Sequence, residues 1–249
     1  MRVMIMHRTT PRWEAGEIPT PELIARVGAM MRDLAQGNRL LGGEGLRASS
    51  LGARLRVRDG QPSVERGPFG GAAEPPAALA IVRVPDLDRA MEWAERLAGD
   101  EREIGIDVRP VTEPWDLGMM EKPADVVGRR YMLVEHRAEA SGARSGAPSQ
   151  GRAASEGRAA RTRALGEMAD AGVLLTSETL KPTAHGKRYR FAGGRHAVVD
   201  GPFAESKELI GGFVLLRVDS LEEAHPLAIR YGECIDVAEV DLREVEEPA

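Results

Sequence analysis

The chain has 249 residues, which is enough for two domains that each bury a core of their own. Its net charge of -5, with acids interleaved among the arginines, argues against a nucleic-acid-binding surface, which needs clustered positive charge. The single cysteine, Cys234, cannot form an internal disulfide and never clusters with histidines at metal-site intervals, so we expect no metal.

The first half of the chain predicts strands and helices in alternation. A short apolar run over residues 3–6 predicts a buried first strand. Thr20, Pro21 and Gly37 are typical of the N-cap, first position and end of an amphipathic helix. The elements predicted after it are a strand over 40–46, a hairpin turning at Asp59-Gly60, a Gly-Pro-Phe turn, a strand over 79–84, a helix capped by Asp86 and a strand over 106–111.

The second half predicts the same order of elements. Its first strand covers 131–134, and the Ala-, Gly-, Ser- and Arg-rich segment 138–160 favours a flexible loop over a substrate lid. The elements predicted next are a helix around 158–169, a strand over 174–180, a hairpin turning at Gly193-Gly194, a strand over 213–218, a helix with a capping box at Ser220 and Glu223, and a strand over 240–245.

The two halves are copies of one domain. Between about residues 37 and 111, adding 134 to a residue number gives its counterpart without a gap, so that Arg54, Phe69 and Asp107 correspond to Arg188, Phe203 and Asp241. A period above 100 residues indicates two duplicated domains, because solenoid repeats are only a few tens of residues long. We predict a first domain over 1–111, a linker over 112–128 and a second domain over 129–249.

This order of elements predicts an α+β fold of two tandem ferredoxin-like (split βαβ) domains, each with an inserted β-hairpin. Helices on one face of such a sheet leave the other face in need of a partner. We therefore expect the two sheets to pack as an intramolecular pseudo-dimer, which is a monomer or pairs again as a homodimer. The first apolar run is too short for a signal peptide and no run approaches membrane-spanning length, so we expect a cytoplasmic protein with no membrane partner.

One motif distinguishes the copies. The second has Asp200-Gly201-Pro202-Phe203, followed by residues 205–213, whereas the first has Arg66 in place of the aspartate. With Glu44-Gly45-Leu46 and residues 107–110, these segments make the chain resemble the YCII-related, or DGPF-domain, family.

The resemblance implies a dimeric α/β-barrel fold, with a possible active site between sheet and helices. It also implies that the chain is related to small-molecule isomerases, dehydrochlorinases and oxygenases, and to proposed enzymes that use a His and Asp pair. Some relatives are encoded beside alternative sigma factors. A site that needs the motif aspartate should exist once per chain.

Asp200 and His136 are the candidate catalytic residues. A carboxylate beside a rigid Gly-Pro turn could act as a general base or orient a histidine, although an aspartate that caps its own turn is the favoured alternative. His136 ends the first strand of the second copy, where it could carry a proton.

The candidate substrate-binding residues are Glu178, Arg188, Arg190 and His196. Glu178, like Glu44, shares a strand face with leucines, and arginines follow on the next strand. A structural Glu to Arg pair is favoured, and the alternative is a cavity in which arginines bind an anion. His196 shares strand parity with Asp200 at a distance of roughly 13 Å, so the two could only bracket a ligand.

These residues predict a protein that binds a small polar or anionic organic molecule. If it is an enzyme, acid and base chemistry without a cofactor, such as elimination or isomerisation, fits best, because no phosphate loop or metal motif is present. The alternative is a non-catalytic binding or regulatory module, linked to a sigma factor or another transcription regulator.

Overall fold

The computed structural model describes residues 1–138, 148–203 and 209–247, and it confirms the predicted order of elements in both copies. The first copy contains β1 (Arg2–Arg8), α1 (Pro11–Glu14), α2 (Pro21–Gln36), β2 (Leu40–Gly45), β3 (Ala53–Arg58), β4 (Gln61–Arg66), β5 (Pro76–Val84), α3 (Leu87–Ala98) and β6 (Ile104–Pro110). The second contains β7 (Arg129–His136), α4 (Pro148–Asp170), β8 (Leu174–Thr179), β9 (Lys187–Ala192), β10 (Arg195–Asp200), β11 (Ile210–Arg217), α5 (Leu221–Ile235) and β12 (Glu239–Glu244).

The helix ends follow the predicted capping signals. The hydroxyl of Thr20 accepts a hydrogen bond from the backbone N–H of Leu23, and the carboxylate of Asp86 accepts one from Arg89. The helix after β7 differs from the prediction, because α4 begins at Pro148 rather than near residue 158. Helix therefore replaces part of the predicted loop, and residues 139–147 of that loop lie outside the described residues.

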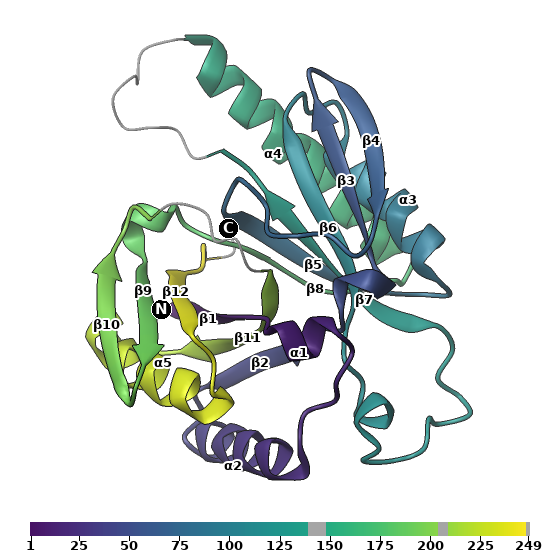
Figure 1. The fold of residues 1–249 in the computed structure, drawn as a ribbon. Coiled ribbons are helices and arrows are strands. Elements are labelled where there is room, and N and C mark those ends of the chain that lie inside the picture. The colour runs from purple at the N-terminus through teal and green to yellow at the C-terminus, as the bar shows by residue number, and fades with distance from the viewer. Residues whose placement is uncertain (139–147, 204–208, 248–249) are drawn as a thin grey trace. The chain divides into compact units, whose positions relative to one another are not determined.

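Each sheet contains strands from both sequence copies. One six-stranded sheet has the order β10-β9-β12-β1-β11-β2, and the other has the order β4-β3-β6-β7-β5-β8 (Figure 1). Strands β1 and β2 of the first copy thus join the hairpin and later strands of the second copy, and β7 and β8 join those of the first. The two compact units follow this exchange: unit 1 covers 1–48, 112–121 and 179–249, and unit 2 covers 49–111 and 122–178.

The exchange preserves the arrangement of the ferredoxin-like fold in each unit. In unit 1, β1 lies between β11 and β12, with Ile5 opposite both Val214 and Leu242. In unit 2, β7 lies in the same way between β5 and β6, with Leu133 opposite both Ala80 and Val108. Equivalent strands of the two copies present the same row of backbone N–H and C=O groups, so a strand from either copy can pair in either sheet.

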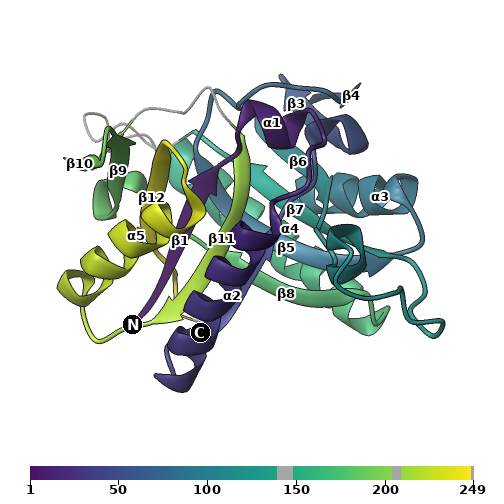
Figure 2. The ribbon, with the colours of Figure 1, turned by 60° about the horizontal axis from the view of Figure 1, so that its bottom comes forward.

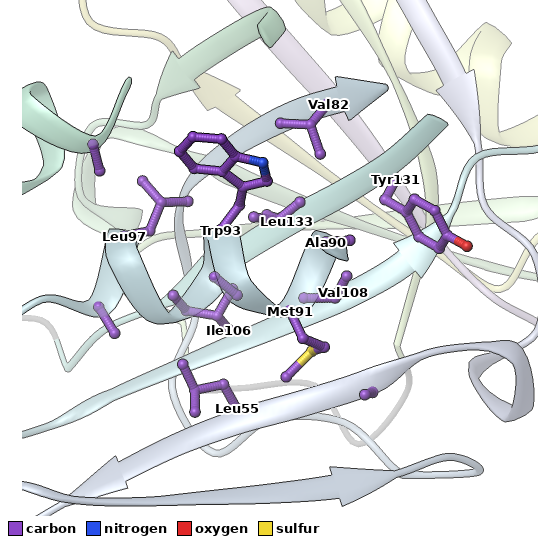
Figure 3. Close-up of a cluster of buried hydrophobic side chains, with 14 of the residues drawn as sticks. Leu55, Val82, Ala90, Met91, Trp93, Leu97, Ile106, Val108, Tyr131 and Leu133 are labelled. Carbon is purple, nitrogen blue, oxygen red and sulfur yellow. The ribbon is translucent and has the colours of Figure 1, made fainter. Parts of the chain in front are cut away.

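The core of unit 2 lies between one face of its sheet and helices α3 and α4 (Figure 3). Trp93 and Leu97 of α3 belong to one buried cluster with Leu55, Ile106 and Leu133 of the neighbouring strands. Side chains alternate between the faces of a strand, so the residues between these apolar ones belong to the opposite face.

Unit 1 is built in the same way, with α2 and α5 beside the strands (Figure 2). Met30 and Leu34 of α2 join Tyr231 of α5 against Val3 and Ile5 of β1. Among the helices within the described residues, none combines the length and the apolar character needed to cross a membrane.

The hydrogen bond that caps the N-terminus of α3 can be tested by mutation. Replacing Asp86 with alanine removes the acceptor 2.9 Å from the N–H of Arg89, so we expect the free energy of unfolding to fall by about 1 kcal/mol. Urea denaturation followed by circular dichroism measures this loss. Asp88→Ala, in the same first turn but not at the cap, is the matched control and should cost clearly less.

Candidate functional site

The candidate site lies on the face of the unit 2 sheet that is opposite to the helices. Arg54 on β3 lies opposite Asp107 on β6, and Arg56 lies opposite Gly105. His136, the last residue of β7, lies on the other side of Gly105. Side chains alternate between the two faces of a strand, so these residues lie on the face opposite to the core residues Leu55 and Ile106. The resemblance implied a site between the sheet and the helices, and this site lies on the other face of the sheet.

Arg54, Asp107 and His136 form a buried charged cluster. The guanidinium of Arg54 donates to Asp107 through both Nε and Nη2, with Nη2 2.7 Å from Oδ2. The Nε2 atom of His136 lies 3.3 Å from the same Oδ2, at an angle that makes no hydrogen bond. Its Nδ1 donates to the carbonyl oxygen of Glu74 at 3.0 Å, which fixes a proton on Nδ1.

The cluster holds Asp107 in its ionised form. Burial by itself would raise the pKa of the Asp107 carboxyl group, but the charge of His136 in its protonated form and the hydrogen bonds from Arg54 outweigh it, and they hold the pKa well below its usual range. A permanent carboxylate at this position can orient the imidazole of His136 and stabilise its cationic form.

The Gly-Pro-Phe turn positions an aromatic ring on the buried arginine. The ring centre of Phe69 lies 4.5 Å from the guanidinium carbon of Arg54, and the backbone N–H of Phe69 donates to the hydroxyl of Ser49. A β-carbon at Gly67 would overlap the carbonyl oxygen of Ser49, so only glycine fits there. Two residues of the motif therefore support the cluster: Phe69 stacks on Arg54, and Gly67 allows the turn to approach Ser49 closely.

A cavity of about 120 Å³ adjoins the cluster. Its lining includes Arg54, Arg56, Gly105 and His136, and also Arg58, which lies beside Glu74 and Glu103. Nη1 of Arg54, Nε of Arg56 and Nε2 of His136 are buried, and none of the three has a hydrogen-bond partner within the described residues. Buried polar nitrogens are rarely left unpaired, and these three belong to residues that line one cavity.

Unit 1 carries the equivalent cluster in another form. Arg188 donates to Asp241 from Nε at 2.7 Å and from Nη2 at 3.0 Å, and the guanidinium carbon of Arg188 lies 4.4 Å from the ring centre of Phe203. Arg8 of β1 takes the place of His136 and also donates to Asp241. Glu239 takes the place of Gly105.

The sequence-predicted catalytic pair is divided between the units. Asp200 lies at the end of the exposed strand β10 in unit 1, where its carboxylate pairs with Lys187 on the neighbouring strand. Contact with Lys187 lowers the pKa of Asp200. His136 lies in unit 2 beside Asp107. No single unit brings Asp200 and His136 together.

The predicted binding residues are divided in the same way. Arg188 and Arg190 lie on β9 of unit 1, where Arg188 pairs with Asp241 and Arg190 with Glu239. Glu178 is buried on β8 of unit 2. His196 lies on β10, near the ring of Phe191. Arg188 and Arg190 thus belong to the unit 1 cluster, whereas Glu178 belongs to unit 2.

Sequence reasoning missed Asp107, Phe69 and Gly105. The repeat contained the signal for all three: Asp107 and Phe69 are identical in both copies, while Gly105 aligns with Glu239. Asp107 and Gly105 are two residues apart on a predicted strand, so the two positions lie on the same face of the sheet. Because glycine has no side chain, this pattern indicates space beside the carboxylate. Within the described ranges, no three His, Cys, Asp or Glu side chains gather in a way that could hold a metal ion.

Comparison with known families gives the same assignment as the sequence motifs. The model of the YCII-related domain matches residues 1–113 and again residues 130–233, which together make up most of the chain. The chain belongs to the YCII-related family. Its two matched segments are the two sequence copies, so this is a tandem YCII-related protein with two six-stranded antiparallel sheets.

Curated relatives of this YCII-related protein give no activity. A protein of Rhizobium meliloti (strain 1021) described as uncharacterised is 44% identical over 55 residues, which cover 22% of this chain. The match spans 44% of that relative's own length, which is less than half. No solved structure gives a significant match.

Proposed function

We propose that this protein binds a small polar or anionic organic molecule in the unit 2 cavity and acts on it by acid and base chemistry without a cofactor. The observation that carries the proposal is the buried Arg54, Asp107 and His136 cluster, whose Arg54 and His136 have unpaired nitrogens and line a cavity. Buried ionisable groups that converge on a cavity are typical of active sites.

His136 is the proton carrier in this proposal. Its Nδ1 proton is fixed by the carbonyl oxygen of Glu74, which leaves Nε2 to accept a proton from the bound molecule. The imidazolium that forms is stabilised by the carboxylate of Asp107, 3.3 Å away. In an isomerisation the same proton is then returned to another atom of the molecule. In an elimination the electrons of the broken C–H bond form a double bond as the leaving group departs with its own bonding electrons, and the proton passes to that group or to solvent.

The arginines hold the molecule rather than react with it. Arg54 is fixed by Asp107 and by Phe69, so its remaining nitrogen Nη1 is a rigid donor on a residue that lines the cavity. Arg56 adds a second donor from the next position on the same face of β3. A guanidinium stays charged at all physiological pH values, and these donors favour an anion or an enolate oxygen.

The test is proton exchange at carbon. The protein is incubated in D₂O with pyruvate, 2-oxobutanoate and acetoacetate, and loss of the C–H signal beside the carbonyl group is followed by proton NMR. We expect the wild-type protein to accelerate exchange of at least one compound, and His136→Gln to lower that rate by about 10²–10⁴-fold. Asp200→Asn, which changes the exposed aspartate of the motif, is the matched control and should retain the rate.

Equal exchange rates for the wild type and His136→Gln would contradict the role of His136. Binding of a compound without any acceleration of exchange would favour the alternative of a non-catalytic binding or regulatory module.

A further inference from the structure

One of the differences between the two units bears on the chemistry of the ligand. Glu239 of unit 1 and Gly105 of unit 2 occupy equivalent places on β12 and β6, since 105 plus 134 is 239. Each lies next to the corresponding arginine of the neighbouring strand, Arg190 or Arg56. Unit 1 therefore contains a side-chain carboxylate where unit 2 has a cavity.

The carboxylate of Glu239 contacts three cations. Its Oε1 lies 3.3 Å from Nε of Arg188 and 3.4 Å from Nε of Arg8, and its Oε2 lies 3.2 Å from Nε of Arg190. Glu239 is also largely buried, with its side chain 15% exposed. One carboxylate thus satisfies donors from three strands.

The residues equivalent to these three cations carry the unpaired nitrogens of unit 2. Arg188, Arg190 and Arg8 correspond to Arg54, Arg56 and His136. Within the part of the chain that the structure describes, Nη1 of Arg54, Nε of Arg56 and Nε2 of His136 have no partner. The side chains of Arg54 and His136 are 2% and 7% exposed.

We propose that the unit 2 cavity binds a small carboxylic acid, whose carboxylate takes the place that Glu239 occupies in unit 1. The unit 1 site is occupied by its own glutamate, so the chain binds one ligand. This inference rests on the proposed function only for the presence of a ligand in unit 2, and it names the class of that ligand.

Size and charge both limit the ligand. A cavity of about 120 Å³ is smaller than the 300–1,000 Å³ pockets that hold drug-sized molecules, so the acid has few atoms beyond its carboxylate. Glu74 and Glu103, which also line the cavity, lie 3.8 and 4.0 Å from Arg58. These two acids disfavour a second negative charge on the ligand, which argues for a monocarboxylate over a phosphate.

Exchanging glycine and glutamate between positions 105 and 239 tests whether the ligand carboxylate takes the place of the Glu239 side chain. Gly105→Glu supplies unit 2 with an internal carboxylate, and a β-carbon at Gly105 would lie 3.6 Å from Cβ of His136, an ordinary contact. Glu239→Gly removes the internal carboxylate of unit 1. The expected number of carboxylate sites per chain is one in the wild type, none in Gly105→Glu and two in Glu239→Gly.

The experiment titrates each protein with acetate and pyruvate, and follows the Nε–Hε signals of the arginines by NMR. Acetamide, which is neutral and has the shape of acetate, should bind at least tenfold more weakly. Thermal unfolding gives a second readout: acetate should raise the midpoint of Glu239→Gly, and should leave that of Gly105→Glu unchanged.

Wild-type affinity retained in Gly105→Glu, or tighter binding of inorganic phosphate than of acetate, would overturn the inference. Failure of the proposed function looks different. In that case acetate binds with these stoichiometries, but His136→Gln has no effect on proton exchange at carbon.

Discussion

Asp107→Asn is expected to lower the free energy of unfolding by about 3 kcal/mol at pH 7. The substitution keeps the shape of the side chain but leaves the charge of Arg54 without its carboxylate, and the Arg54 side chain is only 2% exposed. Breaking a buried ion pair by removing one partner typically costs 3–5 kcal/mol, because the remaining charge is buried and uncompensated.

The control for this variant is Asp88→Asn. Asp88 pairs with Arg66, but both side chains are largely exposed, so the change should cost less than about 1 kcal/mol. Equal effects of the two substitutions in urea denaturation would contradict the structural role of Asp107.

The loss of stability caused by Asp107→Asn should become smaller at low pH. The pKa of Asp107 is lowered in the folded state, so its contribution to stability is fully present above the pKa of about 3.9 of the unfolded chain. It is lost as the pH falls toward the folded pKa. The difference in stability between wild type and variant should therefore shrink as the pH falls below about 4, and a difference at pH 2.5 equal to that at pH 5 would contradict it.

Gly67→Ala is expected to destabilise the protein by more than about 3 kcal/mol. The added methyl group would overlap the backbone carbonyl oxygen of Ser49, which cannot move away as the end of a flexible side chain could. The turn would have to shift, and with it Phe69, which stacks on Arg54. We therefore expect loss of carboxylate binding together with loss of stability.

Gly70→Ala is the matched control in the same loop. A β-carbon at Gly70 meets nothing within 4 Å, so this change should alter stability by less than about 1 kcal/mol. Gly201→Ala places the same steric conflict in unit 1, against the carbonyl oxygen of Thr183, and should match Gly67→Ala in size. Thermal and urea unfolding of the three variants measure these effects.

Much of the fold could be predicted because its signals are local. Thr20, Asp86 and Ser220 cap helices, and Asp59-Gly60 turns a hairpin with both residues at positive φ. Alternation of apolar and polar residues along β3 and β6 separates a core face from a charged face. Each of these features depends on contacts over a few residues, which the order of amino acids specifies directly.

The candidate site could be predicted only in part, because its members come from distant strands. His136 was predicted, but with Asp200 as its partner, since Asp200 belongs to the most distinctive motif. In the structure, Asp107 is the carboxylate beside His136, and the motif contributes through Phe69 and Gly67. Strand parity along the chain gives no information about which strands become neighbours.

The sequence by itself determined the order of elements, the duplication and the membership of the YCII-related family. The tertiary structure alone decided that strands β1 and β7 each complete a sheet with strands of the other copy. Duplicated copies present nearly identical hydrogen-bonding edges, so strand propensity cannot distinguish pairing within a copy from pairing between copies. That exchange brings His136 of the second copy to Arg54 and Asp107 of the first, and Arg8 of the first to Arg188 and Asp241 of the second.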